Sequence, residues 1–320
     1  MRHLLFLFLS LTLSADQHLL DIYQKQGSFA LEKIFDEELS TQQYWRNKLK
    51  DANTSFGYFE TINYLLACNK NDASLKLYAK DINDSFKLSE DFSAFIGKKE
   101  GDKQREGDLK TPIGVYKILQ KLDHVDKFYG PLAFVTSYPN VYDKVQGKNG
   151  SGIWVHGLPL DQERDDYTKG CIAINNTNLQ NIEQKIDFHK ALVYIDQGEF
   201  SKISKETIVI LLSNLYGWRK SWKENDIEQY LSYYNETFKR TDGLNLKRFK
   251  RYKKRIFKKQ EQKQILFTDI NIIPYPLNNQ KNVFLISFLE KYSSKSFQFD
   301  GEKELYVHLD NGIFSILAEK

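Results

Sequence analysis

The sequence predicts three folded units: a helical N-terminal segment, a mainly β sandwich or irregular barrel, and a C-terminal α+β domain. Apolar residues recur at helical spacing between residues 17 and 50. Many short apolar runs separated by Gly, Pro and Asn follow, a pattern typical of β-sandwiches and barrels. Beyond residue 205, one helical stretch precedes long segments of alternating polarity. A chain of 320 residues has room for these units, because domains usually contain about 100–200 residues.

The first fifteen residues, MRHLLFLFLSLTLSA, have the composition of a secretory signal peptide. Arg2 supplies the positive charge, Leu4–Leu13 the apolar core, and Ser14 and Ala15 the small residues of a cleavage site. The alternative is an uncleaved anchor helix, but the apolar run is shorter than the ~20 residues that cross a bilayer. We therefore expect residues 1–15 to be removed and the mature protein to be exported.

Residues 16–58 are predicted to form a helical N-terminal region. The apolar residues at helical spacing are Leu31, Ile34, Phe35 and Leu39, and then Tyr44, Trp45 and Leu49. Ser40 could cap the second helical segment. Helices this short bury little surface alone, so we expect them to pack on a neighbour or on a second copy as a homodimer.

Residues 59–200 are predicted to form the β-rich unit. NYLLACNK and ASLKLYAKD are expected as strands joined by a turn at Asn71 and Asp72, followed by a charged loop, FSAFIGKKEGDKQREGD. Further strands are predicted at VYKILQ, AFVTSY, GIWVHG and KALVYIDQ, and a helix at Asn178–Ile186. Cys68 is predicted to be a buried strand residue, although a disulfide to Cys171 stays possible.

Cys171 and His156 are the candidate catalytic pair, and both lie in the stretch Trp154–Asn176. A thiol is nucleophilic as the thiolate, which a neighbouring imidazole can generate at neutral pH. Gly170 precedes Cys171 and allows a tight turn whose N–H groups can face a developing oxyanion. The alternative is a buried apolar cysteine and a hydrogen-bonded core histidine.

Two motifs mark a resemblance to a known family. The His156-Gly157 pair followed by Thr-Lys-Gly-Cys-Ile resembles the catalytic motif of the L,D-transpeptidase (YkuD-like) family. GDLKTPIGVYKI, residues Gly107–Ile118, resembles the second landmark of that family. The resemblance covers about residues 60–200. The Thr-Pro-Ile-Gly part of the landmark is best interpreted as a turn, because Pro restricts φ and Gly permits unusual backbone angles.

The resemblance implies a reaction on the peptidoglycan stem peptide in the periplasm. No metal is expected, because no His/Cys/Asp cluster of the sequence has ligand spacing, and no cofactor is expected. His156 would take the thiol proton and later donate to the leaving amine, and Cys171 would form a thioacyl enzyme. The carbonyl of Gly157 would orient the imidazole, and the N–H groups of Gly170 and Cys171 would form the oxyanion hole. Substrate contacts are expected from three residues of the same stretch, Trp154, Thr168 and Lys169.

Two residues depart from the family pattern. Lys169 stands where the family commonly has His, and Ala173 where it commonly has Arg. Together with the C-terminal domain, these departures resemble the L,D-carboxypeptidases that trim tetrapeptide stems to tripeptides and contribute to cell shape, with water as acyl acceptor. The alternatives are an L,D-transpeptidase that forms 3–3 cross-links and a non-catalytic wall-binding scaffold.

Residues 205–320 are predicted to form the α+β domain, whose pattern resembles NTF2-like domains. One helix is expected to present Ile227, Tyr230, Leu231, Tyr234 and Phe238 on a single face, capped by Asn225 or Asp226. Strand-like segments follow, with hairpin turns predicted at Asp300-Gly301 and Asn311-Gly312.

Residues 247–263 carry a dense run of Lys and Arg, in which Phe249, Tyr252 and Ile256 recur at helical spacing. The charges are expected to cover the solvated face of a helix. They could also form a docking surface for an anionic partner of the cell envelope. A nucleic-acid partner is not expected, because the protein is predicted to be exported and its formal net charge is only +4.

Overall fold

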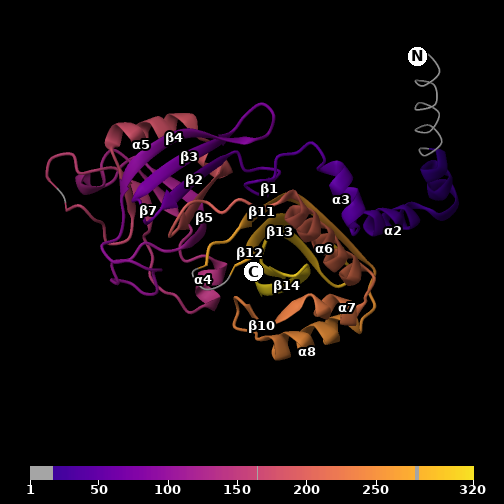
Figure 1. The fold of residues 1–320 in the computed structure, drawn as a ribbon. Coiled ribbons are helices and arrows are strands. Elements are labelled where there is room, and N and C mark those ends of the chain that lie inside the picture. Colours follow the sequence, from indigo (N-terminus) through magenta and orange to yellow (C-terminus); the bar gives the residue numbers. More distant parts are fainter. Residues whose placement is uncertain (1–16, 164, 278–280) are drawn as a thin grey trace, which may run out of the picture.

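The computed structural model describes residues 17–163, 165–277 and 281–320, which form two β-rich bodies with helices α2 and α3 beside the second (Figure 1). The predicted signal peptide, residues 1–15, lies outside the described residues. Of the helices in the described part, none is both long and apolar enough to cross a bilayer.

The N-terminal region is helical, but in three pieces. Residues 17–26 form a helix that ends at Gly27, whose φ is +77°, and α2 (Ser28–Leu39) and α3 (Gln42–Lys48) follow. The predicted cap Ser40 was wrong, because it ends α2, and the side chain of Thr41 accepts from the N–H of Tyr44 to begin α3.

These helices pack on a helix of the C-terminal domain, α6 (Lys205–Lys223). Asp36 of α2 is 6% exposed, and its carboxylate lies 2.5 Å from both Arg219 and Lys223 of α6. Trp45 of α3 is buried and donates to the carbonyl of Leu39. The prediction that the helices pack on a neighbour is therefore confirmed.

The same helices keep large apolar side chains at the surface: Leu20, Tyr23, Phe29, Ile34 and Phe35. If these residues form the predicted dimer contact, the double change Phe29→Ser and Phe35→Ser should lower the solution mass from dimer to monomer, since a stable interface needs an apolar core. Sedimentation velocity measures this, with Ile82→Ser as the control, because Ile82 is fully exposed and lies outside these helices. A mass that is the same before and after the double change would contradict the prediction.

Eight strands close into a barrel in the order β2-β3-β4-β8-β7-β6-β5-β9. Their bounds are β2 (Tyr64–Asn69), β3 (Ser74–Lys80), β4 (Phe86–Phe95), β5 (Gly114–Leu122), β6 (Ala133–Thr136), β7 (Trp154–His156), β8 (Ile172–Ile174) and β9 (Ala191–Asp196). The predicted barrel is thus confirmed. The loop predicted from Phe92 begins later, because the strand β4 continues to Phe95, which pairs with Ala173 of β8.

Short helices accompany the barrel: α4 (Val141–Val145), α5 (Asn176–Lys185) and the 3-10 turns η1 (Lys127–Tyr129) and η2 (Phe188–Lys190). The predicted helix at Asn178–Ile186 is confirmed as α5, which begins earlier because the side chain of Asn175 caps the N–H of Thr177. Leu179 and Ile182 of α5 are fully buried against the strands.

Cys68 lies in β2 between Leu75 of β3 and Ile195 of β9, and it is 1% exposed. Burial raises the pKa of its thiol to about 12. Both cysteines are free, so the possible bridge between Cys68 and Cys171 was wrong.

The C-terminal domain is a six-stranded sheet in the order β1-β11-β12-β13-β14-β10, covered by helices. The bounds beyond α6 are β1 (Tyr58–Phe59), α7 (Ile227–Ser232), β10 (Tyr234–Arg240), α8 (Leu246–Phe257), β11 (Lys263–Pro274), β12 (Val283–Ser294), β13 (Gln298–Asp310) and β14 (Ile313–Glu319).

Two local predictions in this domain were wrong. The helix capped by Asp226 ends at Ser232, so Tyr234 and Phe238 lie on the strand β10 and not on a helical face. The reason is tertiary, because Tyr234 pairs with Ile316 of the distant strand β14. Asp300-Gly301 does not turn either, because both residues pair with β12 inside the continuous strand β13.

The second predicted hairpin turn is confirmed. Asn311 and Gly312 have φ values of +48° and +83° and connect β13 to β14. Positive φ at both central residues is the requirement of the type I′ turn that Asn-Gly favours.

The barrel and the C-terminal domain share an apolar core. Tyr142 of α4 stacks on Tyr306 of β13 at 5.1 Å between ring centroids, and Asn140 donates to the hydroxyl of Tyr275 at 2.8 Å. Phe59, the predicted first residue of the catalytic domain, lies in β1, which pairs with β11. The predicted boundary therefore falls inside a strand of the C-terminal sheet.

Helix α8 has the polarity predicted for the basic stretch, since Phe249 and Phe257 are buried while most of its cations are exposed. Lys253 is the exception at 8% exposed, and its ammonium lies 4.5 Å from the ring of Trp222. Burial lowers the pKa of Lys253 to about 8. The solvated face is confirmed, and an anionic partner for it stays a prediction.

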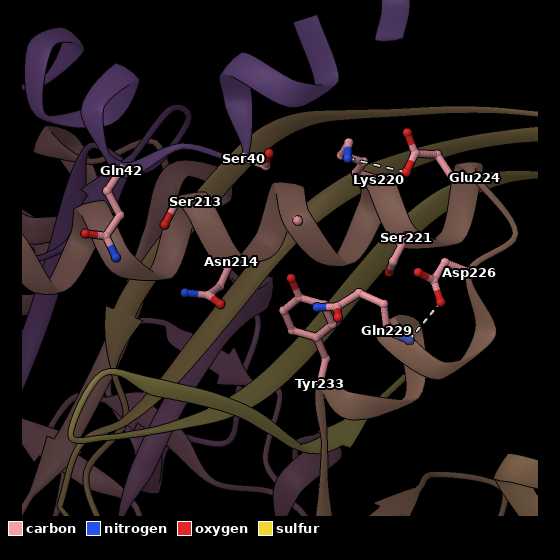
Figure 2. A pocket seen from close by; sticks show the side chains of 11 residues that line it. Ser40, Gln42, Ser213, Asn214, Lys220, Ser221, Glu224, Asp226, Gln229 and Tyr233 are labelled. Carbon is pink, nitrogen blue, oxygen red and sulfur yellow. Dashed lines mark hydrogen bonds and ion pairs between the residues drawn. The ribbon is translucent and has the colours of Figure 1, made fainter. Parts of the chain in front are cut away.

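A polar cleft of about 380 Å³ lies where α6 and α7 meet the start of α3 (Figure 2). Gly217 of α6 forms part of its lining, and a Cβ there would lie 2.5 Å from the hydroxyl of Tyr233. The glycine therefore lets the tyrosine lie directly against the helix.

Candidate active site

Strands β7 and β8 bring the two candidate catalytic residues together. The strands are parallel neighbours, with Val155 opposite Ile172 and His156 opposite Ala173. One residue back in this register, Cys171 lies opposite Trp154, so it shares a face with His156, because alternate strand residues point the same way. Both side chains line one cleft of about 460 Å³.

The cleft is walled by aromatic and polar residues. Besides the pair, its lining residues are Phe128, Tyr129, Glu163, Asp165, Tyr167, Thr168 and Lys169. Of the residues predicted to contact substrate, Thr168 and Lys169 are therefore in the cleft.

The sulfur of Cys171 is half-buried and lies among backbone groups. The N–H of Trp154 donates to Sγ at 3.4 Å, and the thiol donates to the carbonyl of Gly152 at 3.3 Å. An N–H that donates to sulfur favours the thiolate, because hydrogen bonds to a charged form stabilise it. The contact of Trp154 with the pair is made by its backbone, while its ring packs on Tyr129 at 5.0 Å.

His156 is 2% exposed and is held on two sides. Its Nδ1 lies 2.7 Å from the carbonyl of Gly157, which is the contact expected from the sequence. The ring of Tyr129 meets the imidazole edge-on at 5.0 Å. A neutral imidazole that donates from Nδ1 has its lone pair on Nε2, so Nε2 is the ring nitrogen able to accept a proton.

Two residues that hold this arrangement were missed by the sequence analysis. The side chain of Asn176 accepts from the N–H of Leu158 at 2.7 Å and donates to the carbonyl of Leu158 at 3.0 Å. The backbone carbonyl of Tyr129 accepts from the N–H of Gly157 at 2.9 Å. No local pattern marks either residue, because both contacts join separate segments of the chain.

The loop before β8 uses its own polar groups. The hydroxyl of Thr168 donates to the carbonyl of Cys171 at 2.7 Å and accepts from the N–H of Gly170 at 3.0 Å. The hydroxyl of Thr168, which was predicted to bind substrate, is thus hydrogen-bonded within the loop. The predicted oxyanion donor Gly170 is likewise occupied, while Lys169 is exposed at the rim.

Gly170 requires its glycine on two grounds. Its φ is +136°, and a Cβ there would lie 2.7 Å from the carbonyl oxygen of Lys110. Lys110 belongs to the second sequence landmark. The two landmarks therefore touch at the base of the Cys171 loop.

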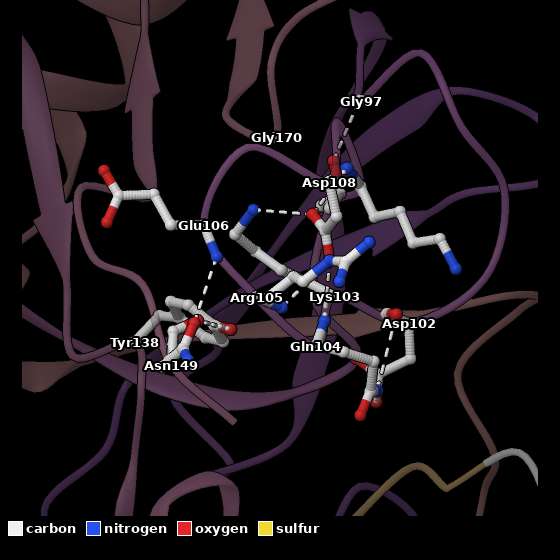
Figure 3. A network of polar contacts seen from close by, with 12 residues as sticks. Gly97, Asp102, Lys103, Gln104, Arg105, Glu106, Asp108, Tyr138, Asn149 and Gly170 are labelled. Atoms are coloured by element: carbon white, nitrogen blue, oxygen red, sulfur yellow. Dashed lines mark hydrogen bonds and ion pairs between the residues drawn. The ribbon is translucent and has the colours of Figure 1, made fainter. Parts of the chain in front are cut away.

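The same landmark is anchored by a polar network (Figure 3). Asp108 accepts from the backbone N–H groups of Gln104, Arg105 and Lys110 and from the ammonium of Lys103 at 2.8 Å. The Lys103 ammonium and these three N–H groups outweigh burial and hold the pKa of Asp108 well below its ordinary value. This carboxylate therefore ties together four residues of the loop before Thr111.

Ala173, where the family commonly has Arg, is fully buried in β8 between Phe95 and His156. An Arg in this environment would need a buried partner for its charge, so a small apolar residue suits the position. Within residues 17–163, 165–277 and 281–320, no group of three or more His, Cys, Asp or Glu side chains is placed to hold a metal ion.

The C-terminal domain has a separate cavity of about 480 Å³. Lys253, Glu290 and Glu319 line it, and Glu290 is 1% exposed. Burial raises the pKa of Glu290 above its ordinary value.

Fold and site together define a protein in which a β-barrel carries a thiol and an imidazole in one cleft and an α+β domain completes the core. The chain belongs to the L,D-transpeptidase (YkuD) family: the catalytic domain of that family matches residues 63–197, and the Cds6 C-terminal NTF2-like domain matches residues 210–320.

Two solved structures match most of this chain, and a curated relative matches part of it. The helical cell shape determining protein Pgp2 from Campylobacter jejuni is 41% identical, with a TM-score of 0.81, over 88% of this chain and 99% of that one. Bd1075 from Bdellovibrio bacteriovorus is 25% identical, with a TM-score of 0.64, over 83% of this chain and 96% of that one. YafK of Escherichia coli K12, which is described as an L,D-transpeptidase, is 31% identical over 120 residues. The match covers 36% of this chain and 44% of YafK. The chain thus spans less than half of this curated relative.

Proposed function

We propose that the protein is an exported, cysteine-dependent L,D-carboxypeptidase. It trims the tetrapeptide stem of peptidoglycan to a tripeptide by removing the D-alanine that follows meso-diaminopimelate, and so contributes to cell shape. The observation that carries the proposal is that His156, at the end of β7, and Cys171, directly before the neighbouring strand β8, line one cleft, with the imidazole held by Gly157. Similarity to Pgp2, described as a helical cell shape determinant, supports the biological role.

The proposed acylation step uses only this pair. Nε2 of His156 takes the thiol proton, and the thiolate of Cys171 attacks the carbonyl carbon between diaminopimelate and D-alanine. The carbon–nitrogen bond breaks, the amine of D-alanine leaves with the proton from the imidazolium, and a thioester remains on Sγ.

Deacylation reverses the roles with water. His156 takes a proton from water, the hydroxide attacks the thioester, and the thiolate leaves and recovers a proton. The products are the tripeptide and the free enzyme. In a transpeptidase, the amine of a second stem peptide would attack in place of water.

Substrate binding is proposed at the rim and at the aromatic wall. Lys169 is exposed at the cleft and could pair with the carboxylate of the terminal D-alanine. Trp154 and Tyr129 pack together and could contact the peptide. The oxyanion hole at Gly170 and Cys171 remains a proposal in which Thr168 first releases the N–H of Gly170.

Hydrolysis is favoured over transfer because Lys169 and Ala173 depart from the common family pattern. We expect the purified protein, incubated with disaccharide tetrapeptide, to yield disaccharide tripeptide and free D-alanine, because water is the acceptor. Mass spectrometry of the products measures this.

Each alternative gives a different spectrum. A dimer linked between two diaminopimelate residues would identify a transpeptidase. Unchanged tetrapeptide, under conditions where the protein is folded, would favour the wall-binding scaffold.

A further inference from the structure

The segment Ile96–Lys99 lies between the two sequence landmarks. On one side Gly97 bridges to Thr168, flanked by a 2.7 Å hydrogen bond from Thr168 to the carbonyl of Ile96. On the other side Lys99 bridges to Lys110, and its N–H donates to the carbonyl of Leu109 at 3.0 Å. The segment therefore couples the second landmark to the loop that carries Cys171.

The hydroxyl of Thr111 makes the central contact of this coupling. Thr111 is fully buried, and its Oγ1 accepts from the N–H of Gly97 at 2.8 Å. Its carbonyl accepts from the ammonium of Lys70 at 2.6 Å, and Lys70 also bonds the carbonyl of Gly101 at 2.5 Å. Thr111 is thus held through both its side chain and its backbone carbonyl.

The backbone at Gly97 packs closely against the backbone of Leu109 and Thr111. A Cβ on Gly97 would lie 2.6 Å from the carbonyl of Leu109 and 2.7 Å from the nitrogen of Thr111. A shift of Thr111 must therefore move Gly97, because closely packed backbones transmit displacement.

From Gly97 the contacts continue to the backbone of Cys171. Thr168 is held by Ile96 and Lys98, and its hydroxyl bonds both the N–H of Gly170 and the carbonyl of Cys171. Each link between Thr111 and Cys171 is therefore a hydrogen bond or a bridge between backbones.

We infer that Thr111 is a positioning residue for the reaction, whose hydroxyl holds the base of the Cys171 loop in place through Gly97 and the backbone of Thr168. The inference rests on the proposed function. Thr111 is not among the residues that line the cleft, so it should affect the rate of the chemical steps and leave substrate binding nearly unchanged.

Two matched variants separate the hydroxyl from the bulk of the side chain. Thr111→Val keeps the shape and loses the acceptor, while Thr111→Ser keeps the hydroxyl. Ser221→Ala removes a buried hydroxyl in the C-terminal domain, which donates to the carbonyl of Trp218, and serves as the control. The acylation rate of Cys171 by the tetrapeptide is measured from the mass of the intact protein. This step occurs in both hydrolysis and transfer, so the measurement does not depend on which reaction follows.

Thr111→Val is expected to lower kcat and the acylation rate about 10- to 100-fold, because a displacement of about 1 Å can cost 100-fold. KM should change less than about twofold, because Thr111 does not line the cleft and the contacts that bind the substrate stay the same. Thr111→Ser should recover most of the rate, Ser221→Ala should match the unchanged protein, and thermal unfolding should show both Thr111 variants folded.

The outcomes distinguish the inference from the proposed function. If the unchanged protein trims tetrapeptide and Thr111→Val trims equally fast, the inference is overturned and the function stands. Equal losses in the Val and Ser variants would also overturn it. If Thr111→Val does not fold, Lys70→Met tests the other end of Thr111, with a lower kcat at constant KM expected and no change contradicting the inference. If the unchanged protein forms neither the thioester on Cys171 nor the tripeptide and free D-alanine, the proposed function itself fails.

Discussion

Cys171→Ala should reduce trimming of tetrapeptide by about 10,000-fold or more, because the nucleophile is lost and only binding and positioning remain. Cys68 cannot replace it, since Cys68 is buried in β2 and burial raises its thiol pKa to about 12. The loss should leave folding intact, because the sulfur of Cys171 is half-buried and its removal opens little core. Product mass spectrometry together with thermal unfolding measures both effects.

Cys68→Ala is the matched control. It removes a thiol from the barrel core, so it should lower the free energy of unfolding by about 1 kcal/mol and leave the turnover of the folded protein unchanged. The assignment of the nucleophile fails if Cys171→Ala keeps a tenth of the activity, or if only the Cys68 variant is inactive.

Gly157→Ala should lower kcat about 100-fold while the protein stays folded. A Cβ at Gly157 would lie 2.2 Å from Oδ1 of Asn176 and 2.9 Å from Cδ of Pro131. The backbone must move to relieve this overlap, and the moving carbonyl is the one that lies 2.7 Å from Nδ1 of His156. The imidazole would then lose the contact that fixes its tautomer and direction.

Gly198→Ala is a suitable control for the glycine change, because a Cβ there meets nothing within 4 Å. It should keep full activity. Steady-state kinetics on the tetrapeptide would reveal the difference, and a Gly157→Ala enzyme with unchanged kcat would show that this carbonyl does not orient the imidazole.

Much of the fold follows from short-range patterns. The paired strands around Asn71 and Asp72 and the Asn311-Gly312 turn form as predicted, because at these positions the tertiary structure agrees with the preference of neighbouring residues. The failures have a common cause. Tyr234 is drawn into a strand by Ile316, and Asp300-Gly301 is kept extended by β12, so distant partners override a local preference.

The site divides in the same way. Cys171 and His156 could be predicted because the chemistry needs a thiol and a base, and motifs of adjacent residues mark them. Asn176 and Tyr129 could not, because their contacts with Leu158 and Gly157 exist only after separate segments meet. The assignments to Thr168 and Gly170 missed that these two residues bond each other.

By itself, the amino-acid order determined which stretches alternate, where the chain turns, and which residues carry reactive groups, because these depend on near neighbours. The tertiary structure decided the rest: that β7 lies beside β8, that Thr111 reaches Gly97, and that Tyr142 joins the two bodies through Tyr306. Such contacts join residues far apart in the chain, and their geometry is set by the packing of the whole core.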